Sequence, residues 1–489
     1  MSTVHHRALP GLAVLLVSTS AAAAPGRHLL LDPLSHAVLT QAHARPSDPG
    51  SKGPYEVGFT SFIAVDGSRS SDGALLYLPD GPKYPGRPVR ILVWYPADPT
   101  SVSGMPEAVY PLDPVYGRAH ATSSMFEKYG FDGAYQEPPV SSAAPFPLLI
   151  FSPGANGNPL SHAWLGARLA SHGFVVAVPY HWGDRYFLGG EPLYVPAVAA
   201  VHRPRDLSFA LTTLLAHGGS PDDLLHGAVR PDQVAAAGWS LGGYAAIVLA
   251  AGDDVVCDAL AGAPASTCIE SPADPRFRAI VTFDAVGHAL HWSELARARV
   301  PSLVMGREWS ILAALVAAGQ DNALLTSVAR PHGAFGGHPN IRVDVSNTNH
   351  QSFSGFCELN EVLHDLGILP DPEYLRRKTN TCTGIAAPTE VHRLLAQYVI
   401  AFLRTALAGD PGLDYYLTPG WALTRESLAE VFVTEKRNPN AAEDECLIGA
   451  SGCPDPQLFL YFPHQPGSEQ ARAEKDPAPA GFTEADEGI

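Results

Sequence analysis

The segment Gly238-Trp239-Ser240-Leu241-Gly242-Gly243 constrains the fold of this chain most strongly, because it predicts a sharp turn between a strand and a helix. The apolar run at 234–237 is typical of a short buried strand, and the Ala-rich run at 244–251 is typical of a packed helix. Small residues on both sides of the serine relieve crowding and leave the hydroxyl clear of the backbone. We therefore predict that Ser240 is a nucleophile.

A serine hydroxyl is a good nucleophile only when a base removes its proton and a carboxylate orients that base. After a turn of this type, the carboxylate is expected first along the chain and the histidine second. Asp284 directly follows the strand-like run at 279–283, and His350 follows the strand-like run at 341–343 and a polar turn. We predict that these two residues complete a triad with Ser240.

Other residues offer alternatives for the two partners. Asp344 is the carboxylate that would orient the histidine if Asp284 does not. Four histidines fit the role of the base less well than His350, because they fall within loops or helices between strands: His288, His291, His332 and His338.

Negative charge that develops on a substrate oxygen requires two backbone N–H donors. One is expected from the residue after the nucleophile, Leu241, and the other from the loop after the third strand. The loop at 151–157 contains glycines that allow close approach of the backbone. We predict that the Ala155 N–H is the second donor.

The core alternates strand-like and helix-like runs, which predicts a mostly parallel sheet with helices on both faces. Together with the turn at Ser240, this arrangement of strands and helices predicts the α/β-hydrolase fold. A helix is predicted over 205–216 and a closing helix over 388–408. The predicted strands, besides 234–237, 279–283 and 341–343, are 89–95, 146–151, 174–178 and 302–305.

The N-terminus predicts export. A short polar start, an apolar stretch and small residues indicate a signal peptide over 1–23, with a membrane anchor as the alternative, and hence a secreted or periplasmic protein. No other segment is long and apolar enough to span a membrane. A leader or linker at 24–53 precedes the catalytic domain at 54–408, and a C-terminal extension at 409–466 precedes a tail at 467–489 whose polar composition predicts disorder.

The six cysteines of an exported chain suggest disulfides. Pairing of neighbours along the sequence is the simplest of several connectivities: Cys257 with Cys268, Cys357 with Cys382, and Cys446 with Cys453. A zinc site is not expected, because no Cys-x-x-Cys occurs. The formal charge of −17 argues against nucleic acid or an anionic membrane as a partner.

The motifs Phe151-Ser152-x-Gly154, Gly238-x-Ser240-x-Gly242-Gly243, Phe283-Asp284-Ala285 and His350-Gln351-x-Phe353 together resemble the platelet-activating-factor acetylhydrolase family of α/β-hydrolases. The start of the domain, around residues 54–58 and 93–96, is similar to its dienelactone-hydrolase-related members. The resemblance runs over about 54–407 and implies ester hydrolysis through an acyl-enzyme. The family usually has histidine at the position of Pro153 and often has histidine at the position of Trp239. Phospholipid specificity is therefore not implied.

These observations predict a secreted serine esterase or lipase that cleaves carboxylic esters, including lipid esters, with no cofactor or metal and no stable membrane insertion. The alternatives are a polyester depolymerase or peptidase of the same fold, or a non-catalytic binding protein. Two further segments leave their role open. The aromatic run at 181–187 lines an acyl pocket or fills the core, and the apolar stretch at 309–325 is a lid or, preferably, a packed helix.

Overall fold

The computed structural model describes residues 48–434, except for 70–83, 113–119, 156, 182–195, 254–270, 288–289, 291, 309–327, 370–381 and 383–385. The chain divides into two compact units, 1–45 and 46–489, and every described residue belongs to the second. The predicted signal peptide, most of the leader and the C-terminal tail lie outside the described residues, as does the apolar stretch at 309–325.

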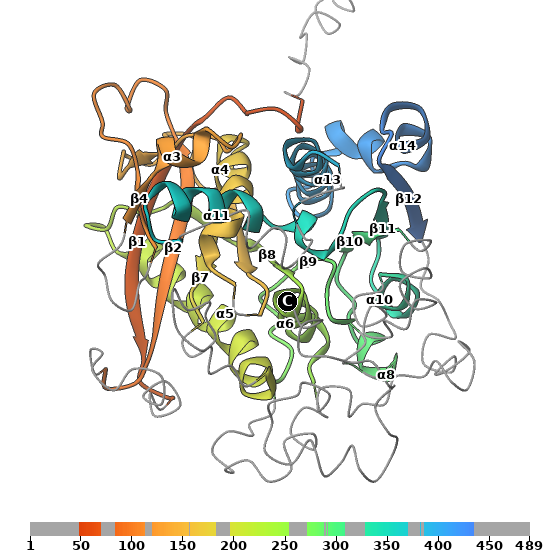
Figure 1. Cartoon of the computed structure of the whole chain (residues 1–489). Coiled ribbons are helices and arrows are strands. Elements are labelled where there is room, and N and C mark those ends of the chain that lie inside the picture. Colours follow the sequence, from red (N-terminus) through yellow and green to blue (C-terminus); the bar gives the residue numbers. More distant parts are fainter. Residues whose placement is uncertain are drawn as a thin grey trace, which may run out of the picture. The chain divides into compact units, whose positions relative to one another are not determined.

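A ten-stranded sheet forms the centre of the second unit, in the order β12-β11-β10-β9-β8-β6-β7-β2-β1-β5 (Figure 1). The six neighbouring strands β7, β6, β8, β9, β10 and β11 run parallel. Strand β2 is antiparallel to both of its neighbours, and β12 is antiparallel to β11. The strands are β1 (Glu56–Asp66), β2 (Arg87–Ala97), β5 (Tyr135–Gln136), β6 (Phe146–Ser152), β7 (Val175–Pro179), β8 (Val229–Trp239), β9 (Ala279–Phe283), β10 (Ser302–Arg307), β11 (Asn340–Val345) and β12 (Ala429–Thr434). Strands β3 (Val109–Pro111) and β4 (His120–Thr122) form a separate small sheet.

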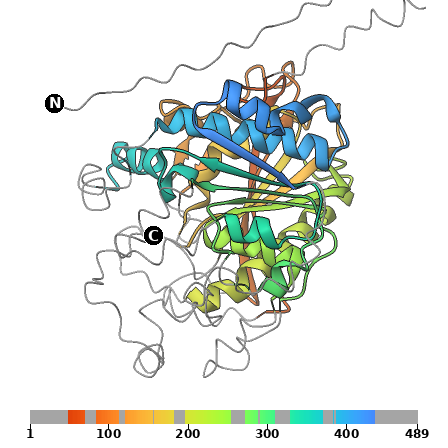
Figure 2. The same ribbon diagram turned by 90° about the vertical axis from the view of Figure 1, so that its right-hand side faces the viewer.

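Helices cover both faces of the large sheet (Figures 1 and 2). Helices α4 (Ala163–Ser171) and α13 (Pro388–Ala406) pack on one face, and α5 (Pro196–Gly219) and α6 (Leu241–Ala251) pack on the other. The remaining elements are α3 (Ser123–Glu127), η1 (Pro159–His162), α8 (Trp292–Leu295), α10 (Ala329–Ala334), η4 (His350–Phe353), α11 (Phe356–Asp365), η5 (Pro411–Leu417) and α14 (Pro419–Arg425). Among the described residues, no helix is both long and apolar enough to cross a membrane.

Strand β6 shows why the central strands form where they do. All seven of its residues are buried, and its side chains alternate between the two cores. Leu149 and Phe151 join the core under α4 and α13, whereas Leu148 and Ile150 join the core under α5 and α6. A strand that is covered on both faces needs apolar residues at every position, which is the pattern of an interior parallel strand.

The predicted fold class is confirmed: this is an α/β-hydrolase fold with a mostly parallel sheet and helices on both faces. The helix predicted from residue 205 begins earlier, because α5 starts at Pro196 and contains Pro204. The charged residues Arg203, Arg205 and Asp206 obscured the apolar pattern there. Part of the C-terminal extension joins the large sheet, since β12 pairs with β11 along its length.

One of the predicted disulfides lies within the described residues. Cys357 and Cys382 are bonded, at a sequence separation of 25. The other four cysteines lie outside the described residues, so the pairings of Cys257 with Cys268 and of Cys446 with Cys453 stay predictions.

Candidate active site

Ser240 lies on a tight turn between β8 and α6. Its backbone has φ 55° and ψ −122°, a strained conformation that an L-residue rarely adopts. The turn is tied to the neighbouring strand, because Ser240 N donates to Phe283 O at 2.9 Å and Ser240 O accepts from Val286 N at 3.1 Å. This is the geometry of a nucleophile elbow at the carboxyl edge of the sheet.

Two glycines of the elbow are required by close approach of the backbone. A Cβ added to Gly242 would lie 2.0 Å from Ser152 O, and one added to Gly238 would lie 2.2 Å from Gly242 C. Any side chain at Gly242 would therefore push the first turn of α6 away from the loop after β6. The Gly-x-Ser-x-Gly pattern thus brings the elbow against the loop that contains Ala155.

Asp284 and His350 are brought together by strands that end at the same edge of the sheet. Asp284 directly follows β9, and His350 opens η4 shortly after β11. The Nδ1 atom of His350 lies 2.5 Å from Oδ2 of Asp284, a carboxylate that is fully buried. The other ring nitrogen, Nε2, is buried and makes no hydrogen bond within the described part of the chain. The unpaired Nε2 is the atom that a general base would present to a serine hydroxyl.

A buried arginine also binds the carboxylate of Asp284. Arg307, at the end of β10, donates from Nε to Asp284 Oδ2 at 2.9 Å. Burial alone would raise the pKa of Asp284, but Arg307 and His350 outweigh it and hold this pKa below its ordinary value. Asp284 is therefore ionised at neutral pH. The sequence interpretation missed Arg307, although its place at the end of a buried strand beside β9 was a usable signal.

Trp239 joins the parts of the site. Its Nε1 donates to the carbonyl of His350 at 3.1 Å, and its ring centroid lies 4.9 Å from that of His350. A Cβ added to Gly154 would lie 2.5 Å from the Trp239 ring, so the indole also packs on the loop after β6. Its side chain therefore supports the histidine turn and the loop of Ala155 at once.

Leu241 and Ala155 lie in two segments that touch. Leu241 is the first residue of α6, where backbone N–H groups have no partner within the helix. Ala155 lies in the loop after β6, which Gly242 contacts. Two N–H groups on adjoining segments are what an oxyanion hole needs.

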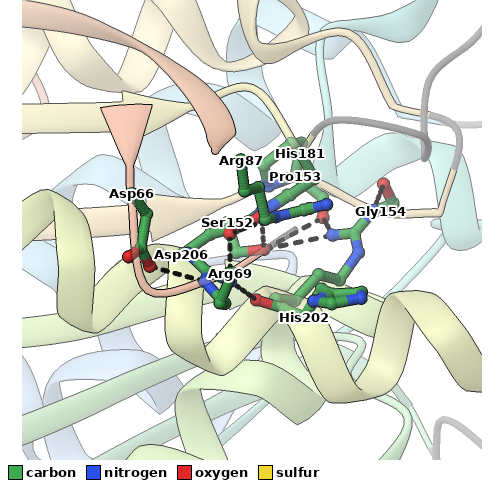
Figure 3. Close-up of polar contacts among 10 residues, drawn as sticks. Asp66, Arg69, Arg87, Ser152, Pro153, Gly154, His181, His202 and Asp206 are labelled. Atoms are coloured by element: carbon green, nitrogen blue, oxygen red, sulfur yellow. Dashed lines mark hydrogen bonds and ion pairs between the residues drawn. The ribbon is translucent and has the colours of Figure 1, made fainter. Parts of the chain in front are cut away.

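A buried cluster of charged residues lies behind this loop (Figure 3). His181 bridges two other side chains, because its Nε2 lies 2.8 Å from Ser152 Oγ and its Nδ1 lies 2.9 Å from Asp206 Oδ2. Asp206 also accepts two hydrogen bonds from Arg87, at 2.8 and 2.7 Å, and pairs with Arg69 at 2.7 Å. The sequence interpretation did not identify this cluster, and it left the role of His181 open. The rest of the aromatic run, 182–187, lies outside the described residues.

The carboxylate of Asp206 is stabilised by its cationic partners. Burial would raise its pKa, but Arg87 and Arg69 outweigh burial and hold the pKa well below its ordinary value. A lowered pKa means that this group stabilises the fold fully above the unfolded-state value, 3.8, and loses that contribution as the pH falls through the folded-state value.

Replacing Asp206 with asparagine is expected to lower the free energy of unfolding by about 3–5 kcal/mol at neutral pH, because Arg69 and Arg87 would stay buried without a counter-charge. The measurement is urea unfolding at pH 7 and at pH 3. The difference in the free energy of unfolding between Asp206→Asn and wild type should be smaller at pH 3, where the wild-type carboxylate has lost part of its stabilising effect. Asp365→Asn, in the exposed pair with Lys128, is the control and should leave the midpoint nearly unchanged. Equal midpoints for both variants would contradict this role.

The alternatives to the predicted partners have other contacts or lie outside the described residues. Asp344 accepts from Arg342 Nε at 2.6 Å. Burial lowers the pKa of His332 to about 4. His288 and His291 are not among the described residues. Within the described residues, no group of three or more His, Cys, Asp or Glu side chains is arranged to hold a metal ion.

Comparison with known proteins finds one family model that matches part of the chain. Residues 41–185 match the family model of platelet-activating factor acetylhydrolase, isoform II, a range that includes Ala155 and ends before Ser240. No curated protein matches the chain. The solved structures that match include a ferulic acid esterase from Streptomyces cinnamoneus, with 19% identity, a TM-score of 0.48, and coverage of 78% of this chain and 97% of that one. The chain thus has an α/β-hydrolase fold, and its residues 41–185 match the model of the platelet-activating factor acetylhydrolase isoform II family.

Proposed function

We propose that the protein is a serine esterase that hydrolyses carboxylic esters through an acyl-enzyme. Ser240 acts as the nucleophile, His350 as the general base and Asp284 as the residue that orients the base. The observation that carries this proposal is the 2.5 Å contact between His350 Nδ1 and Asp284 Oδ2, with the other ring nitrogen unpaired and Ser240 on a strained elbow at the same sheet edge.

In this mechanism the Ser240 oxygen attacks the ester carbonyl while Nε2 of His350 takes the hydroxyl proton. The carbonyl oxygen becomes an oxyanion, which the N–H groups of Leu241 and Ala155 stabilise. The proton then passes from His350 to the leaving alcohol, and the acyl group stays on Ser240. A water molecule that His350 deprotonates releases the carboxylic acid and restores the serine. The steps use side chains and backbone groups of this chain alone.

The substrate class follows from the chemistry of the proposed site. An acyl-enzyme mechanism suits esters of carboxylic acids, and the family model that matches residues 41–185 is named for an enzyme that removes an acetyl group. We propose a small-molecule or lipid ester as the substrate. Fold alone does not fix the acyl chain or the alcohol, which depend on pocket shape.

The test is a series of p-nitrophenyl esters of increasing acyl length, assayed with the purified mature protein. We expect turnover with a distinct optimum, and labelling of Ser240 alone by a fluorophosphonate, read by mass spectrometry of the peptides. A short-chain optimum would indicate an acetyl-type esterase, and a long-chain optimum would indicate a lipase. Absence of turnover on every ester, with no label on Ser240, would overturn the proposal and favour a peptidase or a non-catalytic binding protein.

We also propose that the protein is secreted or periplasmic. The N-terminal sequence supports this, and so does the bond between Cys357 and Cys382, because disulfides persist mainly in oxidising compartments. Detection of the mature protein outside the cytoplasm, with its new N-terminus near residue 24, is the expected result.

A further inference from the structure

Arg203 lies behind the loop after β6 and is completely buried. It comes from α5, and its guanidinium donates to oxygens of three successive residues. Nη1 donates to the carbonyl of Pro153 and, at 3.1 Å, to the hydroxyl of Ser152. Nη2 donates to the carbonyl of Gly154 at 2.7 Å. One side chain therefore fixes both carbonyls that precede Ala155.

The orientation of the Ala155 N–H follows from the bond to Gly154. A trans peptide is planar, and its C=O and N–H point in opposite directions. Among the described residues, the cis peptide bonds are Ala144-Pro145 and His338-Pro339, so the peptide between Gly154 and Ala155 is trans. Because the Gly154 carbonyl is directed at Arg203, the Ala155 N–H is directed away from the buried side of the loop.

The Ser152 hydroxyl that accepts from Arg203 is itself held in place. Ser152 Oγ, which accepts from Arg203, also lies 2.8 Å from His181 Nε2, and His181 is bound to Asp206 on its other side (Figure 3). The order of bonds is that of a catalytic triad. Ser152, however, is fully buried at the end of β6, and its oxygen accepts a hydrogen bond from a cation, which lowers its nucleophilicity. This second Ser-His-Asp set is therefore a structural support.

The charge of Arg203 also acts on the loop. The three contacts above go from the guanidinium to two carbonyls and a hydroxyl. A cation on a carbonyl polarises the whole peptide and makes its N–H a stronger donor in a buried setting. A fixed, polarised donor stabilises an oxyanion without reorganisation during the reaction.

Resting on the proposed esterase function, we propose that Arg203 is a positioning residue of the oxyanion hole. It holds the peptide between Gly154 and Ala155 so that the Ala155 N–H is directed at the oxyanion formed at Ser240. Ser152, with His181 and Asp206 behind it, keeps the guanidinium in that position.

The test uses Arg203→Met, Arg203→Lys and Ser152→Ala. Each variant is assayed with the best p-nitrophenyl ester, and kcat is divided by the fraction of active serine measured by burst titration. We expect Arg203→Met to lower kcat by about 10- to 100-fold with KM changed by less than about 3-fold. The reason is that a displaced Ala155 N–H weakens a hydrogen bond to the oxyanion, which forms mainly in the transition state. Arg203→Lys keeps the charge but not the fork of donors, so it should restore part of the rate, and Ser152→Ala should have a smaller effect than Arg203→Met.

A second readout separates positioning from stability. A trifluoromethyl ketone with the same acyl chain forms a tetrahedral adduct with Ser240, and its oxyanion requires the same N–H donors. Its inhibition constant should rise by the same factor as kcat/KM falls across the variants. If Arg203 has only a structural role, its variants should lower the melting temperature and the fraction of active serine but leave the inhibition constant of the ketone unchanged.

Arg404→Met is the matched control. Arg404 is partly buried and, like Arg203, donates to a backbone carbonyl, that of His172. His172, however, lies just before β7, at the opposite edge of the sheet. This variant should lose stability and keep kcat per active serine. The proposal is overturned if the Arg203 variants behave like Arg404→Met. If neither Arg203 variant folds, an unchanged inhibition constant in Ser152→Ala overturns it. Wild-type protein that turns over no ester and takes no fluorophosphonate label on Ser240 would instead refute the proposed function.

Discussion

Ser240→Ala is expected to lower kcat for p-nitrophenyl esters by about 10⁶-fold, because no acyl-enzyme can form without the hydroxyl. The residual rate would come from the oxyanion donors and from binding alone. The melting temperature should change little, since the variant loses a single hydroxyl and keeps the backbone turn of the elbow. Initial rates and thermal unfolding of the two purified proteins are the measurements.

Ser302→Ala is the matched control for this experiment. Ser302 is also a buried serine, but it opens β10 at the opposite edge of the sheet and donates to Asn340 at 2.8 Å. It should keep the wild-type rate. Retention of more than about 1% of the wild-type rate by Ser240→Ala would remove Ser240 from the proposed mechanism.

Asp284→Asn is expected to lower kcat at neutral pH by about 10⁴-fold. Arg307 donates to the carboxyl group of Asp284, so the asparagine oxygen should turn toward Arg307 and its NH₂ group toward His350. An NH₂ group that donates to Nδ1 forces the proton onto Nε2, and this tautomer cannot accept the serine proton. Rates at pH 7, with unfolding curves to show that the variant is folded, test this result.

Asp344→Asn serves as the control for the carboxylate. Asp344 lies on β11 near the same sheet edge but is bound by Arg342, so its amide should leave turnover unchanged. The opposite pattern, with full activity in Asp284→Asn and little in Asp344→Asn, would assign the orienting role to Asp344.

The central strands and the elbow could be predicted from sequence because their signal is local. Strands such as β6 and β9 are short runs in which every residue is buried, and such runs stand out against polar connections. The long first strand, β1, was not predicted as a strand, because more than half of its residues are only partly buried and its apolar pattern is correspondingly weak. The start of α5 was hidden by charged residues that would ordinarily indicate an exposed loop.

The supporting roles of Arg87 and Arg203 could not be predicted, because their partners are remote in sequence. Arg87 and Asp206 are separated by 119 residues, and Arg203 and Gly154 by 49. A buried charge looks like a surface charge in a single sequence until its counter-charge is located. For this reason the candidate order Ser240, Asp284, His350 could be proposed from motifs, whereas Arg203 required coordinates.

The cluster around Asp206 has a consequence for the order of folding. It joins Arg87 at the start of β2 to α5, and through Ser152 it reaches the loop of Ala155. Contacts between segments so far apart in sequence have a large entropic cost of loop closure. They therefore form only after much of the chain is already folded. The N-terminal hairpin of β1 and β2 must therefore dock before the cluster behind the loop of Ala155 is complete. Recovery of activity during refolding should thus lag behind formation of the parallel core, even though Ser240, Asp284 and His350 all lie within that core.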